Sequence, residues 1–325
     1  MSMKFGLVGL PNVGKSTIFN LIAGQEIARA SNFPFCTIDP NTAITQVIDE
    51  KIKRLGEISK SAQVIYPRLE CVDIAGLVKG ASEGAGLGNK FLSHIRQVDL
   101  ILHVVRCFED ADIQHVNNKV DPEADSSLIG DELLLADIDM CEKLLENKKA
   151  SKLYTPDQLK TLNKAMQLLS KSIPIRKEIN SFTPDEVKFI NEKGLITAKP
   201  MLYVANVDSL EAELKANFDA PVIKINPMEP EGSIDYLIRM SYKELGLVTF
   251  YTTGPAESRG WSVKVGSPAK EAAGVIHSDF KKKFIAASVV KYEDFISQGK
   301  AAKPRIEGAN YLMQDGDICE FRIGR

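Results

Sequence analysis

A glycine-rich turn near the start of the chain carries the residue types that bind phosphate. Residues 9–16 read GLPNVGKS, which matches the pattern G-x-x-x-x-G-K-[ST], and they lie between an apolar run and a segment with helical spacing. The two glycines let the backbone curl so that successive N–H groups point inward at the positive end of the helix. The turn therefore predicts a site for nucleotide phosphates, and a chance match on a tight turn is the alternative.

Lys15 and Ser16 have distinct predicted roles in this turn. Lys15 would lie along the β- and γ-phosphates, and the Ser16 hydroxyl would ligate Mg²⁺. The other predicted nucleotide contacts in the turn and the start of the helix are Asn12, Val13, Gly14 and Thr17. These residues together predict a site for a magnesium-bound nucleotide.

Two later segments offer groups for the metal and the γ-phosphate. Asp73 and Gly76, in DIAG, end the next apolar strand, where a carboxylate can reach the metal, through water, and a glycine amide can meet the γ-phosphate. Between the two motifs, Thr37 could close over Mg²⁺ and the γ-phosphate with its hydroxyl and carbonyl; an ordinary loop threonine is the alternative. We therefore predict Ser16, Thr37 and Asp73 around the metal, and Lys15, Thr37 and Gly76 among the catalytic groups.

The residue after Gly76 predicts slow hydrolysis. Small GTPases of the Ras type carry a glutamine there that orients the attacking water, whereas this chain has Leu77. An aliphatic side chain cannot orient water, so hydrolysis should be slow, assisted by another group, or dependent on a partner. The glycine-rich run that follows, residues 80–88, suits a mobile switch, and an inert loop is the alternative.

The segment after a later strand bears on the choice of base. GTPases usually end that strand in N-K-x-D, whose aspartate accepts hydrogen bonds from guanine. Here the strand ends in Asn206-Val207-Asp208-Ser209, so that no carboxylate stands at the aspartate position. Guanine loses its main anchor, and we therefore predict ATP as the nucleotide, with Asn206 and Val207 near its base.

Composition narrows the class of protein. The chain has 325 residues, 44% of them hydrophobic, which suffices for two or three domains. No apolar stretch approaches the roughly 18 residues of a membrane helix, so we expect a cytoplasmic protein without a membrane partner. The five cysteines are scattered without a Cys-x-x-Cys pair, which indicates buried thiols rather than disulfides or zinc ligands.

The order of apolar segments predicts an α/β fold with a mostly parallel sheet. Continuous apolar strands favour a sheet covered on both faces, and the helix after the phosphate turn is expected to end at Gly24. The expected strands are 3–9, 69–76, 99–106, 199–206 and 220–226, with a helix at 232–245.

Two further regions differ in pattern from this sheet domain. Residues 131–193 carry apolar residues at helical intervals, with two Thr-Pro-Asp openings typical of helix starts, which predicts an inserted helical hairpin. After Leu245, short strands and one helix, PAKEAAGVIH, predict a compact mixed domain. The predicted domains are a P-loop domain at 1–130 and 196–245, the insertion at 131–195, and a C-terminal domain at 246–325.

Long stretches of the chain resemble the YchF / Obg-like ATPase family, a branch of the Obg-related translation-factor GTPases. The resemblance rests on GLPNVGKST, NFPFCTIDPN, DIAGLVKGASEGAGLGNKFL and HVVRCFED, and in the C-terminal region on GWSVKVGSPAKEAAGVIHSDFKKKFIAASVVKYEDF and YLMQDGDICEF. It implies a P-loop G domain, a coiled-coil insertion and a ubiquitin-like TGS domain of the β-grasp kind. It also implies Mg²⁺-dependent hydrolysis of ATP in preference to GTP, and binding to ribosomes or their large subunit, with rRNA contacts through the insertion and the TGS domain.

The resemblance also implies roles for individual residues. His115 matches a loop histidine that has been proposed to assist catalysis in bacterial members, and an exposed, idle histidine is the alternative. Asn206 and Phe108 match the family's adenine pocket, and Asn12 resembles the asparagine that binds K⁺ in cation-stimulated GTPases. The chain departs from the family pattern N-x-x-E, because Ser209 replaces the glutamate. The insertion and the segment from 206 to 246 are also short beside typical bacterial members.

Two other functions remain open at this stage. One is a GTPase switch of the Obg type. The other is a ribosome-binding or RNA-binding module whose nucleotide site is only regulatory, for which the weakly basic C-terminal region, with 12 lysines and arginines against 9 acidic residues after position 245, offers modest support.

Overall fold

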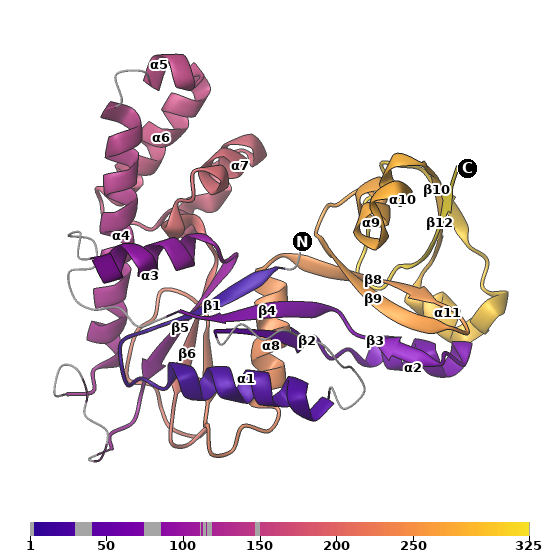
Figure 1. The fold of residues 1–325 in the computed structure, drawn as a ribbon, viewed down its shortest axis with the longest axis horizontal. Helices are drawn as coiled ribbons and strands as arrows, with labels where there is room; N and C mark the ends of the chain where they lie inside the picture. Colours follow the sequence, from indigo (N-terminus) through magenta and orange to yellow (C-terminus); the bar gives the residue numbers. More distant parts are fainter. Residues whose placement is uncertain are drawn as a thin grey trace. The chain divides into compact units, whose positions relative to one another are not determined.

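The computed structural model describes residues 3–29, 41–74, 86–110, 112, 115, 119–146 and 150–324. Its contacts divide the chain into two compact units (Figure 1). The first, here called the N-terminal unit, comprises Met3–Ala43 and Glu70–Ile234, and the second, the C-terminal unit, comprises Ile44–Leu69 and Asp235–Arg325. The predicted α/β class is confirmed.

A six-stranded sheet with the order β2-β4-β1-β5-β6-β7 organises the first part of the chain. Its strands are β1 (Lys4–Val8), β2 (Thr42–Gln46), β4 (Arg68–Asp73), β5 (Leu100–Arg106), β6 (Met201–Asn206) and β7 (Val222–Ile225). β1 pairs in parallel with β4 and β5, β5 with β6, and β6 with β7. Every residue of β5 and β6 is buried, which is why these strands are mostly apolar in sequence.

Two helices differ from their expected bounds. α1 (Lys15–Arg29) continues past Gly24, because a glycine inside a helix costs only about 1 kcal/mol relative to alanine and does not by itself end it. α3 (Gly86–Arg96) starts at the end of the glycine-rich run 80–88, so residues 86–88 are helical, and the switch role of the run remains a prediction. The expected helix at 232–245 is confirmed as α8 (Ser233–Glu244).

The helical region between β5 and β6 begins earlier than expected. α4 (Pro122–Glu146) starts before position 131, and its 25 residues give it a length of about 37 Å. It packs against β5 near the sheet and against α6 (Pro156–Leu169) beyond it (Figure 1). The remaining helices are α5 (Ala150–Leu153), η2 (Ile175–Ser181), α7 (Pro184–Glu192) and η3 (Ile196–Ala198).

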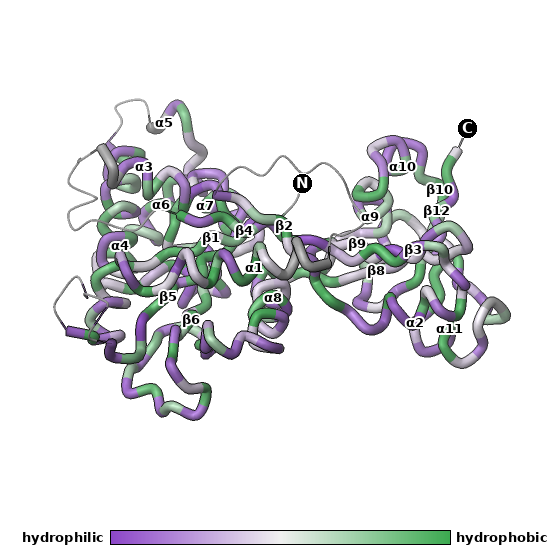
Figure 2. Tube along the Cα trace, turned by 60° about the horizontal axis from the view of Figure 1, so that its bottom comes forward, coloured by the Kyte–Doolittle hydropathy of each residue, from purple (hydrophilic) through white to green (hydrophobic). Residues whose placement is uncertain are grey.

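Both Thr-Pro-Asp openings start helices as predicted. Thr155 caps α6 and Thr183 caps α7, each through a reciprocal capping box with the residue three positions later. Buried residues from α4, α6 and α7, including Leu134, Leu169 and Ile190, form the core of this region. Figure 2 shows the corresponding alternation of hydrophobic and hydrophilic residues along these helices.

The C-terminal unit contains a mixed sheet with the order β11-β10-β12-β8-β9-β3. Its elements are α2 (Glu50–Ser59), β3 (Gln63–Ile65), β8 (Leu247–Thr253), β9 (Glu257–Lys264), α9 (Ala269–Ile276), α10 (Ser278–Lys282), β10 (Phe284–Val290), α11 (Tyr292–Gln298), η4 (Gly299–Ala301), β11 (Arg305–Glu307) and β12 (Ile318–Ile323). The expected helix PAKEAAGVIH is confirmed as α9, and the expected short strands are present.

Residues 44–69 belong to the C-terminal unit although they lie early in the chain. β3 pairs in parallel with β9, and Ile52 and Leu55 of α2 are buried against Tyr251 and Phe295. Asp49 caps α2 and also accepts a hydrogen bond from the Tyr251 hydroxyl. The three predicted domain ranges did not separate this segment, and they remain a prediction.

His103 is a buried titratable group that its surroundings keep neutral. His103 of β5 is 1% exposed, and its ring centroid lies 5.0 Å from that of Tyr203. Burial lowers the pKa of His103 to about 3, with the nearby Arg176 adding to the shift.

The described cysteines, Cys71, Cys107, Cys141 and Cys319, are free thiols. None of the described helices is long and apolar enough to cross a membrane.

Candidate functional site

The carboxyl ends of four neighbouring parallel strands bring the predicted site residues to one edge of the sheet. β1 leads into the phosphate turn, β4 ends at Asp73, β5 ends at Arg106 and β6 ends at Asn206. β1 lies between β4 and β5, so that the chain connections diverge on its two sides. In open parallel sheets, ligands bind outside the carboxyl ends at such a point.

At two positions of the turn the backbone lies so close to neighbouring strands that only glycine fits. A Cβ atom at Gly9 would lie 2.5 Å from the Val104 carbonyl oxygen, so the turn can pass β5 only without a side chain. Gly14 has a φ of +97°, and a Cβ there would lie 2.3 Å from Nδ2 of Asn206. The two glycines are therefore needed for the turn to pack against β5 and β6, in addition to their predicted role in phosphate binding.

Lys15 is buried at the first position of α1. Its side chain is 8% exposed, and Nζ donates a hydrogen bond of 2.7 Å to the Leu10 carbonyl oxygen across the turn. Burial lowers the pKa of Lys15, and the nearby Asp73 carboxylate acts in the opposite direction. The ammonium group is thus held across the turn, with the Asp73 carboxylate nearby.

The structure brings together Ser16 and Asp73, two of the residues predicted around the metal. The Ser16 hydroxyl donates a hydrogen bond of 3.2 Å to Oδ2 of Asp73. Mg²⁺ prefers oxygen ligands and is usually bound by one or two protein groups together with water and substrate phosphates. The described residues contain no cluster of three or more His, Cys, Asp or Glu side chains that could hold a metal alone. A hydroxyl and one carboxylate beside a phosphate turn fit the magnesium of a nucleotide rather than a resident metal centre.

Asn206 links the base side of the site to the phosphate turn. Its side chain is 4% exposed, and Nδ2 donates a hydrogen bond of 2.9 Å to the Val13 carbonyl oxygen. Oδ1 is buried, and no described residue donates to it. A buried acceptor without a donor is costly, so this oxygen is a candidate for contact with a ligand.

The backbone directly before Phe108 is bonded to that of Asn206. The Cys107 amide donates to the Asn206 carbonyl oxygen over 2.8 Å, which ties the segment after β5 to the end of β6. The guanidinium of Arg106 lies 4.8 Å from the centroid of the Phe108 ring and donates to the Phe108 and Asp110 carbonyl oxygens. Arg106, which the sequence did not single out, therefore fixes the half-buried aromatic ring predicted for the base pocket.

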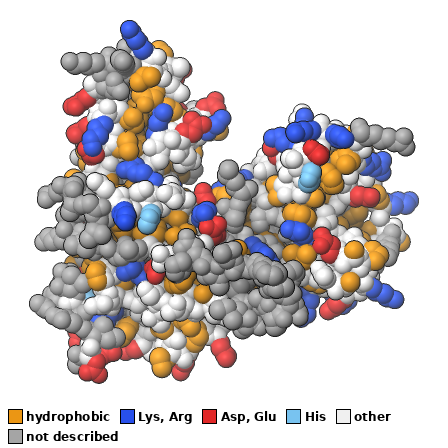
Figure 3. All heavy atoms as spheres, viewed as in Figure 1, with side chains coloured by type: hydrophobic (Ala, Val, Ile, Leu, Met, Phe, Trp, Pro, Cys, Tyr) orange, Lys and Arg blue, Asp and Glu red, His pale blue; other side chains and the backbone are white. Residues whose placement is uncertain are grey.

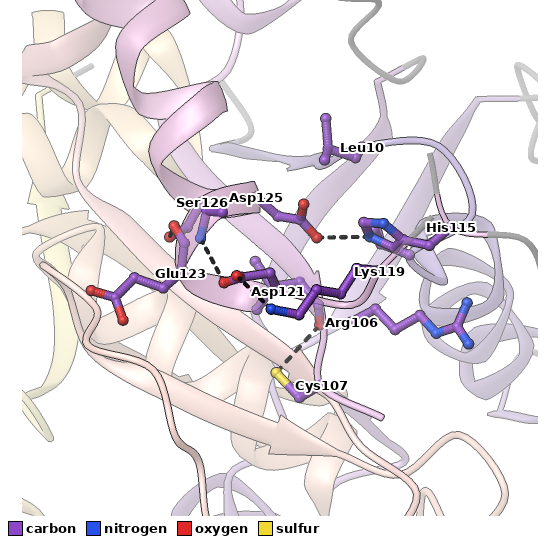
Figure 4. Close-up of polar contacts among 12 residues, drawn as sticks. Leu10, Arg106, Cys107, His115, Lys119, Asp121, Glu123, Asp125 and Ser126 are labelled. Atoms are coloured by element: carbon purple, nitrogen blue, oxygen red, sulfur yellow. Dashed lines mark hydrogen bonds and ion pairs between the residues drawn. The ribbon is translucent and has the colours of Figure 1, made fainter. Parts of the chain in front are cut away.

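His115 is neither exposed nor isolated. Nε2 of His115 lies 2.8 Å from Oδ2 of Asp125, and the two side chains are 3% and 2% exposed. Figure 4 shows the two side chains pointing toward one another, with Asp125 on the first turn of α4. The alternative of an exposed histidine is therefore wrong, and the pair ties the His115 segment to the helical region.

The other predicted residues divide into three groups. Asn12 is exposed and has a φ of 62°, in the left-handed region that asparagine tolerates. Thr17 is exposed on α1, whereas the side chains of Val13 and Val207 are buried. Thr37, Gly76 and Leu77 lie outside the described residues.

The departure at Ser209 has a local structural role. The Ser209 hydroxyl oxygen accepts a hydrogen bond of 3.3 Å from the Glu211 amide, which closes a turn after β6. One residue earlier, the Asp208 carbonyl oxygen accepts a hydrogen bond of 3.0 Å from the Asn226 side chain. Sequence reasoning missed Asn226, although a buried polar residue directly after a strand at the ligand edge was a usable signal.

Two family models match separate parts of the chain. A model described as a 50S ribosome-binding GTPase (MMR_HSR1) matches residues 4–134. A model named YchF-GTPase_C and described as a protein of unknown function (DUF933) matches residues 247–324.

Curated relatives match over nearly the whole chain. The protein named ribosome-binding ATPase YchF from Bacillus subtilis is 42% identical over 367 aligned positions, which cover 99% of this chain and 100% of the relative. The protein of the same name from Escherichia coli O157:H7 is 39% identical over 362 positions, covering 99% of each. Both alignments are longer than the 325 residues of this chain, so the relatives contain internal segments that it lacks.

A solved structure shares the fold. The structure titled Schizosaccharomyces pombe YchF GTPase matches with a TM-score of 0.84 and 34% sequence identity, covering 99% of this chain and 98% of that one. The predicted resemblance is confirmed over the full length. The curated relatives and this solved structure each match at more than 30% identity over nearly the whole chain. The chain therefore belongs to the YchF family.

Proposed function

We propose that this chain is a ribosome-binding ATPase that hydrolyses ATP to ADP and phosphate and acts as a slow nucleotide switch in translation or stress regulation. The curated relatives at about 40% identity carry the name ribosome-binding ATPase. Lys15, Ser16 and Asp73 lie at one edge of the sheet, where Nζ of Lys15 reaches across the phosphate turn and the Ser16 hydroxyl contacts the Asp73 carboxylate, which supports the proposal. An intact site of this kind supports an enzyme over a binding module with a vestigial nucleotide site.

The observation that carries the choice of ATP is the buried Oδ1 of Asn206. This oxygen accepts hydrogen bonds and has no donor among the described residues. Adenine presents an amino group, a donor, beside its N7 atom, whereas guanine presents a carbonyl oxygen, an acceptor, at the same place. An adenine amino group would satisfy Oδ1, and a guanine carbonyl oxygen would repel it.

The proposed chemistry is electrostatic positioning of the phosphates. Lys15 would exchange its hydrogen bond with the Leu10 carbonyl oxygen for the β- and γ-phosphates. Ser16 would hold the magnesium ion directly, and Asp73 would hold it through water, as their 3.2 Å contact supports. Magnesium would neutralise phosphate charge, while Thr37 and Gly76 remain proposed contacts for the γ-phosphate.

Slow hydrolysis follows from the side chains available to orient water. Leu77 cannot do so, and His115 is engaged by Asp125 in the interior. We propose His115 as the assisting group, which would have to leave Asp125 to act. Potassium bound near Asn12 is a further proposal, based on the resemblance alone.

The proposed partner surfaces are the helical region and the C-terminal unit. Figure 3 shows charged side chains of both signs around hydrophobic ones over the helical region, where Leu135 and Leu153 are exposed, and basic side chains gathered over α9 and α10. Lys281 and Lys282 pair with Glu271 and Asp279, which reduces the net positive charge of that surface. We propose rRNA contacts through the 131–195 insertion and a TGS-type domain at 246–325, in the cytoplasm.

A GTPase switch is the second candidate function. The Schizosaccharomyces pombe relative is titled a GTPase, and Ser209 stands where the family carries a glutamate. The base-side loop of this chain therefore differs from the family pattern, which gives the alternative its support.

Sedimentation with purified ribosomes tests the proposed function. Full-length protein is expected to pellet with ribosomes and to do so to a different extent with a non-hydrolysable ATP analogue than with ADP, because a switch must bind its partner differently in its two states. Phosphate released from ATP is measured in the same samples. Absence from the pellet under every condition would remove the ribosomal part of the proposal, and absence of phosphate release would remove the enzymatic part.

A further inference from the structure

The segment between two residues proposed for the metal site belongs to the other compact unit. Thr37 precedes β2 in the sequence and Asp73 ends β4, whereas residues 44–69, between them, are part of the C-terminal unit. The boundaries between the units fall inside these two strands, after Ala43 in β2 and after Leu69 in β4. The chain therefore leaves the N-terminal unit and returns to it between two groups proposed to hold magnesium.

β2 and β4 form a hydrogen-bonded ribbon that starts beside the proposed metal site. The Asp73 amide donates a hydrogen bond of 2.9 Å to the Asn41 carbonyl oxygen, and the Val47 amide donates one of 2.8 Å to the Pro67 carbonyl oxygen. The two strands, with these bonded residues at their ends, are called the β2/β4 ribbon. From Asn41 to Val47 the ribbon covers about 20 Å. Paired strands of this kind can carry a displacement from one end to the other, because their hydrogen bonds make them move together.

Both strands of the ribbon are anchored at the end that lies in the C-terminal unit. Next to β2, Asp49 caps α2 and accepts a hydrogen bond from the Tyr251 hydroxyl, and α2 is buried against the same tyrosine. Next to β4, Pro67 lies against Gly260 of β9, where a Cβ atom would come within 2.8 Å of Cδ of the proline. Only glycine at position 260 allows this approach, so the position of the ribbon end is closely fixed within its unit.

We propose that the β2/β4 ribbon couples the nucleotide state of the N-terminal unit to the C-terminal unit, with Tyr251 and Gly260 as the residues that anchor it. The inference rests on the proposed nucleotide site. Thr37 and Asp73, on the two sides of the ribbon, hold the magnesium and the γ-phosphate of ATP, and ADP lacks the γ-phosphate contacts. The ribbon is then held differently at its ligand end in the two states. Because its other end is anchored, the difference reaches the C-terminal unit.

The single tryptophan of the chain is placed to report this difference. Trp261 of β9 is half-buried, and Cζ of Arg259 lies 4.0 Å from its ring centroid. Arg259 is paired with Ile65 of β3, the strand that directly precedes β4 in the chain. A shift of β4 therefore acts on the strand that positions the guanidinium over the ring. Tryptophan emission depends on the charge and polarity around the ring, so it should follow such a shift.

Nucleotide binding to full-length variants tests the inference. Affinities for ADP and for a non-hydrolysable ATP analogue are measured with Mg²⁺, together with Trp261 emission in each complex. In the unmodified protein the two complexes should differ in emission. Tyr251→Phe keeps the ring but removes the hydrogen bond to Asp49, so it should halve this difference or more, and change the ratio of the two affinities about fivefold. Gly260→Ala, which displaces Pro67, should change the ratio by a similar factor.

Matched substitutions elsewhere in the C-terminal unit serve as controls. Tyr311→Phe removes a hydrogen bond of 2.9 Å to Asp317, and Gly308→Ala adds a methyl group in open space. Both should leave the ratio of affinities within about twofold of that of the unmodified protein.

Three results would overturn the inference. One is a ratio in Tyr251→Phe and Gly260→Ala equal to that of the controls, and another is identical Trp261 emission of the two complexes in the unmodified protein. The third is an equal weakening of both nucleotides in these variants, which would indicate a loss of folded protein. Failure of the unmodified protein to bind either nucleotide would instead refute the proposed function on which the inference rests.

Discussion

Lys15→Ala is expected to lower ATP turnover at least about a hundredfold. Removing one hydrogen-bond donor to the negative charge that develops in a transition state has an effect of this size. Lys15 is the buried cation of the phosphate turn, and its hydrogen bond to the Leu10 carbonyl oxygen holds Nζ across the mouth of that turn. No uncharged side chain can replace its attraction for the β- and γ-phosphates. ATP binding should weaken as well, because the same charge acts on bound substrate.

The measurement is phosphate release at saturating ATP, together with the ATP dissociation constant. Lys160→Ala is the matched control, because Lys160 is an exposed lysine on α6 and should leave turnover unchanged. Circular dichroism spectra that coincide for both variants would show that the fold is kept. Unchanged turnover in Lys15→Ala would mean that the phosphate turn is not the site of hydrolysis.

The second large effect is expected on stability. Asp137 of α4 is fully buried, and its carboxylate accepts hydrogen bonds from the Ile196 and Thr197 amides and from the Thr197 hydroxyl. Burial raises the pKa of Asp137, and these donors act against that rise. Asp137→Asn would place an NH₂ group against a buried N–H, so we expect a loss of about 3 kcal/mol in the free energy of unfolding.

Asp139→Asn is the control for this prediction. Asp139 lies on the same helix, two residues later, and forms an exposed ion pair with Lys143 that should contribute less than about 1 kcal/mol. Denaturant unfolding of the three proteins gives the comparison. A loss of stability in Asp137→Asn no greater than that in Asp139→Asn would contradict the view that Asp137 fixes the return of the helical region to β6.

The sequence predicted the elements whose cause is local. β5 and β6 are buried on both faces and are therefore mostly apolar in sequence. Thr155 and Thr183 start helices because their hydroxyls bond amides three residues away, a distance that a short pattern captures. The phosphate turn was predictable for the same reason, since glycine positions, lysine and serine all lie within eight residues.

Features that depend on distant residues could not be predicted from such patterns. Asn206 bonds the Val13 carbonyl oxygen across 193 positions, and the pairing of β3 with β9 joins a segment near the start of the chain to the C-terminal unit. The pairing of His115 with Asp125 also depends on where α4 begins, which periodicity placed too late. The sequence indicated which polar residues stand at strand ends, but it did not predict the residues to which they are hydrogen-bonded.

The proposed site would connect the choice of base with phosphate binding. Asn206 supports the backbone of the phosphate turn with Nδ2, and Oδ1 has no donor among the described residues, so a single side chain would join both ends of the proposed nucleotide site. A change at Asn206 should therefore affect both functions together. Ser209, in contrast, is bonded within its own turn.

Competition binding tests the central claim, that this nucleotide site is built for adenine. Labelled ATP is bound to the full-length protein in the presence of Mg²⁺ and displaced with unlabelled ATP or GTP on the same preparation. Oδ1 of Asn206, for which no described residue is a donor, predicts that ATP binds at least about tenfold more tightly than GTP, which corresponds to about 1.4 kcal/mol. Equal or tighter binding of GTP would contradict the account.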